Sequence, residues 1–146
     1  MAPGEEVTSS PSPPETPRSG YQQFMGYRIV NWREGLAVAE LTVGPQHLNS
    51  SGVLHGGVLM SLVDTACGYA GCFSAEPGGR RRAFTLSLTT SFTAPVTGGI
   101  VKAVGRVRFG GSRTFFCDAE VFDENDNVVA IGQGTFQYRR DSLGQG

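Results

Sequence analysis

The stretch HLNSSGVLHGGVLMSLVDTA, residues 47–66, joins a glycine-rich turn to an amphipathic helix. From Leu59 onward, apolar residues recur with the period of a helix that buries one stripe. The stripe consists of Leu59, Leu62, Val63, Ala66, Cys67 and Ala70. The pattern predicts a helix from about Gly56 to Phe73, around which the rest of the chain is organised.

Asp64 lies on this helix but not on its apolar stripe. At about 100° per residue, it faces a strip shared with Gly57, Ser61, Gly68 and Gly71. Each glycine inside a helix costs roughly 1 kcal/mol relative to alanine, so we expect another backbone or a ligand to come close there. Asp64 is therefore a candidate site residue.

The length and composition predict one domain. The chain has 146 residues, of which 39% are hydrophobic, enough for one core and too few for two ordinary domains. Residues 1–19 are rich in Pro, Ser, Thr and Glu and are expected to form a disordered tail. The domain should span residues 20–139, and residues 140–146 should be a frayed polar tail.

The charge distribution argues against a nucleic-acid partner. The formal net charge is -1, and the basic run Arg80–Arg82 is interpreted as a solvated loop. The sequence has no apolar run of about 18 residues and no hydrophobic signal-peptide core, so we expect no membrane association. The expected location is the cytoplasm.

Cysteine and histidine usage gives no indication of a cofactor. Cys67, Cys72 and Cys117 form no C-x-x-C pair, and their odd number favours reduced thiols. The chain has only two histidines, His47 and His55, and no thiol cluster, so we expect no metal site.

Six segments have the alternating pattern of strands. Two short strands, Tyr27–Asn31 and Leu36–Val43, precede the helix. Four more follow it, at residues 84–92, 101–109, 115–122 and 128–138. Short turns between consecutive strands predict an antiparallel meander. The economical arrangement is an α+β fold in which a five- or six-stranded antiparallel sheet wraps around one long central helix.

The motifs of several enzyme classes are absent from the sequence. It has no G-x-S-x-G elbow, H-E-x-x-H, P-loop or complete G-x-G-x-x-G. The remaining candidates are Asn49, His55, Gly56 and Asp64. A helix that begins at Gly56 or Gly57 offers unpaired backbone N–H groups and a positive dipole end, which suit an acyl oxygen that acquires negative charge.

Asp64 supplies a second half of an acyl-transfer site, as a general base for water or as a nucleophile. It lies eight residues after Gly56, about 12 Å along a helix axis, which is too far for both groups of one chain to act on one carbonyl. The conflict disappears if Gly56 of one subunit faces Asp64 of another across a two-fold axis. This geometry predicts a homodimer with paired composite sites.

These residues also carry a family resemblance. The run N-x-x-G-x-x-H-G-G followed by L-x-D-T-A resembles the PaaI-like group of hotdog-fold acyl-CoA thioesterases. The likeness extends from about Tyr27 to Phe136 and includes FTLSLTTSFTAPV at 84–96, the turn at Gly110 and Gly111, and AIGQGTF at 130–136. It implies a hotdog fold, dimers that often pair into tetramers, and hydrolysis of a coenzyme A thioester without a cofactor beyond the coenzyme A of the substrate.

The resemblance also implies roles for individual residues. Gly56 would polarise the thioester carbonyl through its N–H, and Asn49 would orient the substrate or the attacking water. His55 would support the loop and the sulfur side, Asp64 of the partner subunit would be the base or nucleophile, and Thr85 would help to hold the water. The expected pantetheine and nucleotide contacts are Phe92, Gly110, Gly111, Ser112, Arg113 and Thr114, with Arg113 binding phosphate.

Other interpretations remain open. A hotdog hydratase or dehydratase would need its own pair of a histidine with Asp or Glu. A non-catalytic acyl-CoA-binding module would use the same pocket without turnover. His55 and Asn49 could simply hold the turn before the helix, and Arg113 could be an exposed residue at a strand end.

Overall fold

A computed structural model describes residues 18–76 and 81–140. Its elements are α2 (Gly20–Met25), β1 (Arg28–Arg33), β2 (Leu36–Thr42), the 3-10 helix η1 (Pro45–His47), α3 (Gly56–Gly71), β3 (Ala83–Phe92), β4 (Ile100–Gly110), β5 (Thr114–Phe122) and β6 (Val128–Tyr138). Residues 1–17 and 141–146, which make up most of the two predicted tails, and residues 77–80 lie outside the described residues. Among the described helices, none is both long and apolar enough to cross a bilayer.

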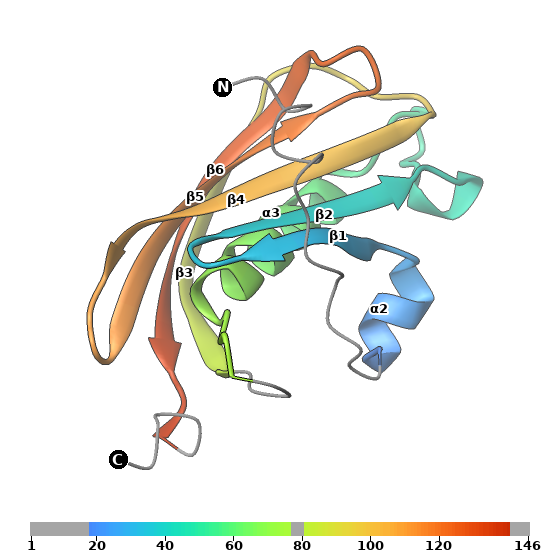
Figure 1. The fold of residues 1–146 in the computed structure, drawn as a ribbon. Coiled ribbons are helices and arrows are strands. Elements are labelled where there is room, and N and C mark those ends of the chain that lie inside the picture. The colour runs from blue at the N-terminus through green and yellow to red at the C-terminus, as the bar shows by residue number, and fades with distance from the viewer. Residues whose placement is uncertain (1–17, 77–80, 141–146) are drawn as a thin grey trace.

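The six strands form one antiparallel sheet in the order β1-β2-β4-β5-β6-β3. The sheet curves around α3, which lies along its concave side (Figure 1). Contacts join α3 to all six strands. The predicted α+β architecture, with a six-stranded sheet around one long helix, is therefore confirmed.

The predicted stripe of α3 forms the centre of the core. All six of its residues, Leu59, Leu62, Val63, Ala66, Cys67 and Ala70, are buried. The helix lies directly on β4, because a Cβ added at Gly105 would be only 2.6 Å from the carbonyl carbon of Ala66. The helix ends at Gly71, two residues before the predicted end, and Cys72 is its C-cap.

The three cysteines are free thiols, as predicted, and all three are buried. A hydrogen bond with Cys117 and burial raise the pKa of Cys67 above its ordinary value. The thiol of Cys67 is therefore neutral and acts as a small core residue, in line with its place on the apolar stripe.

The predicted meander is wrong for the step from β3 to β4. β3 pairs with β6 at the edge of the sheet, whereas β4 lies between β2 and β5. The connecting segment, residues 93–99, runs past the start of α3: Leu54 N–H donates to the Val96 carbonyl at 2.7 Å and Val43 N–H to the Gly99 carbonyl at 2.8 Å. A short connection predicts a hairpin, but this one crosses the end of the curved sheet.

A β-bulge interrupts β3 between Thr85 and Ser87, where its register against β6 shifts. Thr85 is hydrogen-bonded to Asp64 of α3, and Leu88 packs against the hydrophobic core that contains the apolar stripe of α3. These two residues are three positions apart, so an unbroken strand would place them on opposite faces. The bulge lets both face the helix, which is a common use of bulges near functional sites.

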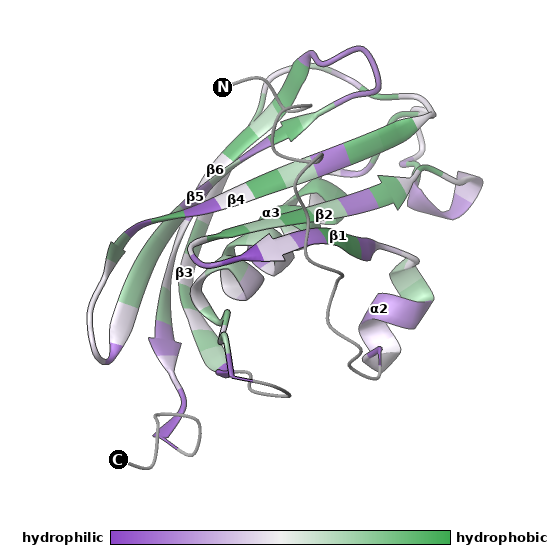
Figure 2. Cartoon of the chain, in the orientation of Figure 1, coloured by the Kyte–Doolittle hydropathy of each residue, from purple (hydrophilic) through white to green (hydrophobic). Residues whose placement is uncertain are grey.

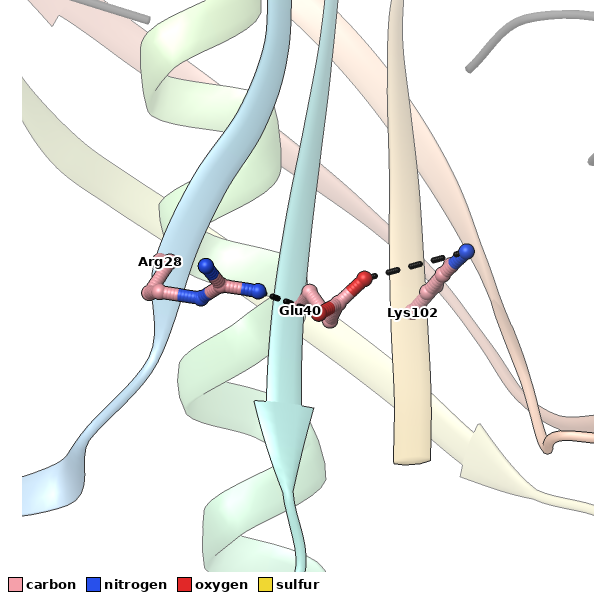
Figure 3. A network of polar contacts seen from close by, with 3 residues as sticks. All are labelled: Arg28, Glu40 and Lys102. Atoms are coloured by element: carbon pink, nitrogen blue, oxygen red, sulfur yellow. Dashed lines mark hydrogen bonds and ion pairs between the residues drawn. The ribbon is translucent and has the colours of Figure 1, made fainter. Parts of the chain in front are cut away.

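Charged side chains lie on the outer face of β1, β2 and β4 (Figure 3). Glu40 lies directly across from Arg28 and Lys102 in register, and its carboxylate is 2.7 Å and 3.7 Å from their nitrogens. Partly exposed ion pairs of this kind contribute about 0–1 kcal/mol each. Figure 2 shows polar residues at the β1–β2 and β5–β6 turns and hydrophobic residues along the central strands.

His47 ties the loop before α3 to the N-terminal part of the chain. Its side chain is 2% exposed; its Nδ1 accepts from Gly44 N–H at 2.9 Å, and its Nε2 lies 2.8 Å from the Met25 carbonyl. Met25 ends α2, a short helix that was not predicted, which begins where Ser19 Oγ accepts from Gln22 N–H. The His47 carbonyl in turn accepts from His55 N–H at 2.9 Å, so this histidine positions the start of α3.

Candidate active site

The start of α3 presents one unpaired backbone donor. His55 is the N-cap, and its Nδ1 accepts from Gly57 N–H at 2.8 Å. Within residues 18–76 and 81–140, the N–H of Gly56 has no hydrogen-bond acceptor. Because the first amides of a helix carry its positive end, Gly56 N–H is suited to bind an oxygen that gains negative charge.

Asn49 shapes the turn that leads to this helix. Its Oδ1 accepts from Ser51 N–H at 2.9 Å and from Val53 N–H at 3.2 Å. The carbonyl half of this side chain is therefore used by the loop, which agrees with the capping interpretation. The NH₂ half is a donor that these two bonds do not use.

Asp64, in the middle of α3, and Thr85, near the start of β3, lie together. Thr85 Oγ1 donates to Asp64 Oδ1 at 2.6 Å, a short distance typical of a hydroxyl bonded to a carboxylate. Asp64 is half-buried and Thr85 is exposed. The bond holds one carboxylate oxygen, which leaves the other for a substrate or a water.

Gly56 lies near Phe92, which is at the far end of β3. A Cβ added at Gly56 would be 3.0 Å from Phe92 Cζ, and both residues line a cavity of about 350 Å³. The chain therefore carries two groups of predicted residues on the same helix and strand: Gly56 with Phe92, and Asp64 with Thr85. Asp64 follows Gly56 by eight positions along α3, which separates the two groups by about 12 Å.

Asp64 and Thr85 line a second cavity, of about 360 Å³, that follows α3 toward its C-terminal end. Its wall contains three cationic side chains, Arg81, Arg82 and Arg139. The guanidinium of Arg81 lies 4.1 Å from the centre of the Tyr138 ring. The interpretation of Arg80–Arg82 as a solvated loop holds for Arg82, which is exposed, whereas Arg81 is half-buried against Tyr138; Arg80 lies outside the described residues. Their position directly before β3 was the available signal.

The predicted coenzyme A contacts at residues 110–114 form the β4–β5 turn. Gly111 N–H donates to the Thr114 carbonyl at 2.8 Å, and Arg113 is exposed while its carbonyl accepts from Tyr138 N–H at 2.8 Å. Tyr138 pairs with Ala83 at the start of β3. This turn therefore lies at the end of the sheet away from Phe92, so one chain does not bring it to Gly56.

The free edge strand β3 is uncharged and carries exposed apolar side chains. Over its ten residues, AFTLSLTTSF, it has no charge and no proline, and its outer side has no neighbouring strand in the described part of the chain. Phe84, Leu86 and Phe92 are 58%, 55% and 52% exposed. Long apolar edges like this one pair with another chain unless they are blocked.

No group of three metal-binding side chains occurs among the described residues. The described residues bring three chemical groups to the candidate site: the Gly56 N–H, the Asp64 carboxylate and the Thr85 hydroxyl.

Comparisons with known proteins agree on one family. A family model described as the thioesterase superfamily matches residues 51–130. Acyl-coenzyme A thioesterase PaaI of Escherichia coli is 35% identical over 111 residues, which cover 75% of this chain and 76% of that protein.

Solved structures show the same relationship. The E. coli PaaI protein from the phenylacetic acid degradation operon superposes with a TM-score of 0.73 at 31% identity, covering 84% of this chain and 86% of that one. The conserved protein PA5202 of Pseudomonas aeruginosa superposes with a TM-score of 0.76 at 35% identity, covering 84% and 95%. The sheet and its central helix are therefore those of the hotdog fold.

Proposed function

The chain belongs to the thioesterase superfamily, as a PaaI-like hotdog thioesterase, and on that premise we propose that it hydrolyses acyl-CoA thioesters at sites shared between two subunits. The observation that carries the proposal is the pair of half-sites: an unpaired N–H at Gly56 and a hydroxyl-bound carboxylate at Asp64. The Gly56 half-site lacks a base or nucleophile, and the Asp64 half-site lacks a donor for the carbonyl oxygen.

Pairing of two β3 edges is the proposed route to a complete site. Thr85 with Asp64 lies toward the start of β3, and Phe92 with Gly56 lies at its end. If two copies of β3 pair antiparallel about a two-fold axis, the start of one strand lies beside the end of the other. Gly56 of one subunit then faces Asp64 of the partner subunit. The exposed apolar side chains of β3 support this contact; pairing of dimers into tetramers stays a prediction.

In the proposed reaction, Gly56 N–H donates to the thioester carbonyl oxygen and stabilises the charge that develops on it. Asp64 of the partner subunit accepts a proton from water, whose oxygen bonds to the carbonyl carbon. The C–S bond then breaks, and the coenzyme A thiolate takes up the proton. The products are a free acid and coenzyme A. In the alternative course, the Asp64 carboxylate attacks the carbonyl carbon and the C–S bond breaks. Water then hydrolyses the resulting anhydride and supplies the proton that the coenzyme A thiolate takes up.

The other predicted residues have supporting roles in this proposal. Asn49, whose NH₂ group is not used by its loop bonds, would orient the substrate or the water. His55 would hold the helix start through its bond to Gly57 N–H. The pantetheine would run along Phe92, and the nucleotide would lie on the partner's β4–β5 turn, where Arg113 would bind phosphate.

Thr85 is expected to position Asp64. Thr85→Val removes a hydrogen bond to a charged group, and such bonds contribute about 1.5–3 kcal/mol, so kcat should fall about 10- to 100-fold. Thr85→Ser keeps the hydroxyl and should restore most of the rate. Steady-state thiol release measures both variants; equal losses in Val and Ser would show that the hydroxyl is not used.

The reaction itself is tested by the release of free thiol from a panel of acyl-CoAs by the purified protein. The panel should pair short with long and aliphatic with aromatic acyl groups. We expect turnover of at least one member that rises linearly with enzyme concentration. Acyl-CoA binding without any thiol release would favour the non-catalytic alternative.

A further inference from the structure

Two glycines of α3, Gly68 and Gly71, lie on the same side of the helix as Asp64. Glycine inside a helix lowers stability relative to alanine, so each position needs a reason. Packing explains Gly71, because a Cβ there would be 2.1 Å from Phe115 Cε2. No side chain would fit at that position without moving the core.

Packing does not explain Gly68. A Cβ added there would meet only Phe136 Cε1, at 3.9 Å, which is an ordinary van der Waals contact. Its backbone lies within α3 and does not have a positive φ angle. Alanine would therefore fit at this position and would favour the helix. Glycine at this position therefore lowers helix stability without a packing reason within the chain.

Gly68 borders the cavity that begins at Asp64 and Thr85. It lies four residues after Asp64, one helical turn or about 6 Å farther along the cavity. Tyr27 and Phe136, which are 6% and 2% exposed, form fixed walls beside it. Burial raises the pKa of Tyr27 above its ordinary value, so this wall stays uncharged. Cys72 at the end of α3 and the three arginines Arg81, Arg82 and Arg139 also line the cavity.

The size of the cavity matches a small ligand group. Its volume of about 360 Å³ lies within the range of pockets that bury small molecules, but coenzyme A is far too large to enter it. The part of the substrate that fits beyond the reacting carbonyl is the acyl group.

We propose that this cavity holds the acyl group and that glycine at position 68, which has no side chain, sets the width of the cavity where the acyl group passes it. The inference rests on the proposed thioesterase function and names its substrate class: acyl groups that extend more than one helical turn beyond the thioester, whether aromatic or long-chain. Short acyl groups end before they reach Gly68. Gly68 is thus a specificity-determining residue, and Gly71 is a packing residue.

The test compares Gly68→Ala and Gly68→Val with the wild type on propionyl-CoA, octanoyl-CoA and phenylacetyl-CoA. Gly68→Ala should raise the midpoint of thermal unfolding, leave kcat/KM for propionyl-CoA within about twofold, and lower it at least tenfold for the two larger substrates. Gly68→Val should increase the selectivity further. Gly98→Ala is the control, since a Cβ there meets no atom within 4 Å.

Two results would overturn the inference. One is an equal loss on all three substrates, and the other is an unchanged ratio between large and small acyl groups in both Gly68 variants. Binding of non-hydrolysable thioether analogues of the same three substrates gives the same comparison without turnover. If the wild type released no thiol, the proposed function would fail, while the analogue affinities would still decide the role of Gly68.

Discussion

Replacement of Asp64 by asparagine is expected to abolish most of the thioesterase activity. Asparagine has the same shape, and its Oδ1 can still accept the hydrogen bond from Thr85 Oγ1, so the fold and the local geometry should remain. The amide can neither accept a proton from water nor attack a carbonyl. General-base catalysis by a positioned side chain contributes about 10²–10⁴-fold, and kcat should fall by that amount.

The measurement is steady-state thiol release at saturating substrate, with thermal unfolding to verify the fold. Glu34→Gln is the matched control, because it neutralises an exposed carboxylate in the β1–β2 turn, far from α3 in sequence. A rate for Asp64→Asn within a few-fold of wild type would refute the role of this carboxylate in either form. Single-turnover reactions in ¹⁸O-labelled water separate the role of general base from that of nucleophile. Only a nucleophilic Asp64 transfers its own carboxylate oxygen to the product.

The helix was predictable because one physical signal determined it. The apolar stripe of α3 has a 3.6-residue period that only burial against the sheet explains, and all six of its residues are buried. The same period showed that Asp64 faces away from the stripe, next to Gly68. The distance between Gly56 and Asp64 followed from helical rise, without any knowledge of the sheet.

The position of β3 was not predictable in this way. Alternation indicates that a segment is a strand, but it does not name the neighbouring strand, and residues 93–99 gave no sign that they cross the end of the sheet. The bulge at residues 85–87 was equally hidden, because it interrupts a regular alternation of Phe84, Leu86 and Leu88 with hydroxyl residues. Without the bulge, Thr85 would not share a face with Leu88.

The two helical glycines show where sequence reasoning stops. Both lie on the face of α3 that contains Asp64, and both predicted that another backbone or a ligand comes close there. The structure separates them, since Phe115 fills the space at Gly71, whereas a Cβ at Gly68 would make only an ordinary contact with Phe136. That difference depends on an aromatic side chain from β5, which no local pattern in α3 could reveal.

Mixing two inactive variants should restore activity if each site uses two subunits. Gly56→Pro removes the N–H that is proposed to donate to the thioester carbonyl, and Asp64→Asn removes the proposed base. In a mixed dimer, one site combines Gly56 of the Asp64→Asn chain with Asp64 of the Gly56→Pro chain and is intact. With random pairing, half of the dimers are mixed and one of their two sites is intact, so about a quarter of the wild-type activity should return.

The proline variant suits this test because the start of α3 can accommodate it. Gly56 is the first helical residue, where proline is favoured, and His55 has φ -63° and ψ 136°, a conformation that a residue before proline prefers. Alone, it should lose about 10²–10³-fold in kcat, the effect of removing one oxyanion donor. Gly56→Ala is the control, since it puts the same Cβ against Phe92 but keeps the N–H, and it should retain most of the activity.

Co-expression of the two inactive chains, followed by thiol-release assays at equal total protein, measures the recovery. Recovery requires that Gly56 and Asp64 act across the subunit boundary, because a site within one chain would remain broken in every subunit. If Gly56→Pro and Asp64→Asn are each inactive and their mixture is also inactive despite verified mixed dimers, the two groups act within the same chain. The 12 Å between them along α3 would then have to be closed by a rearrangement of the helix start.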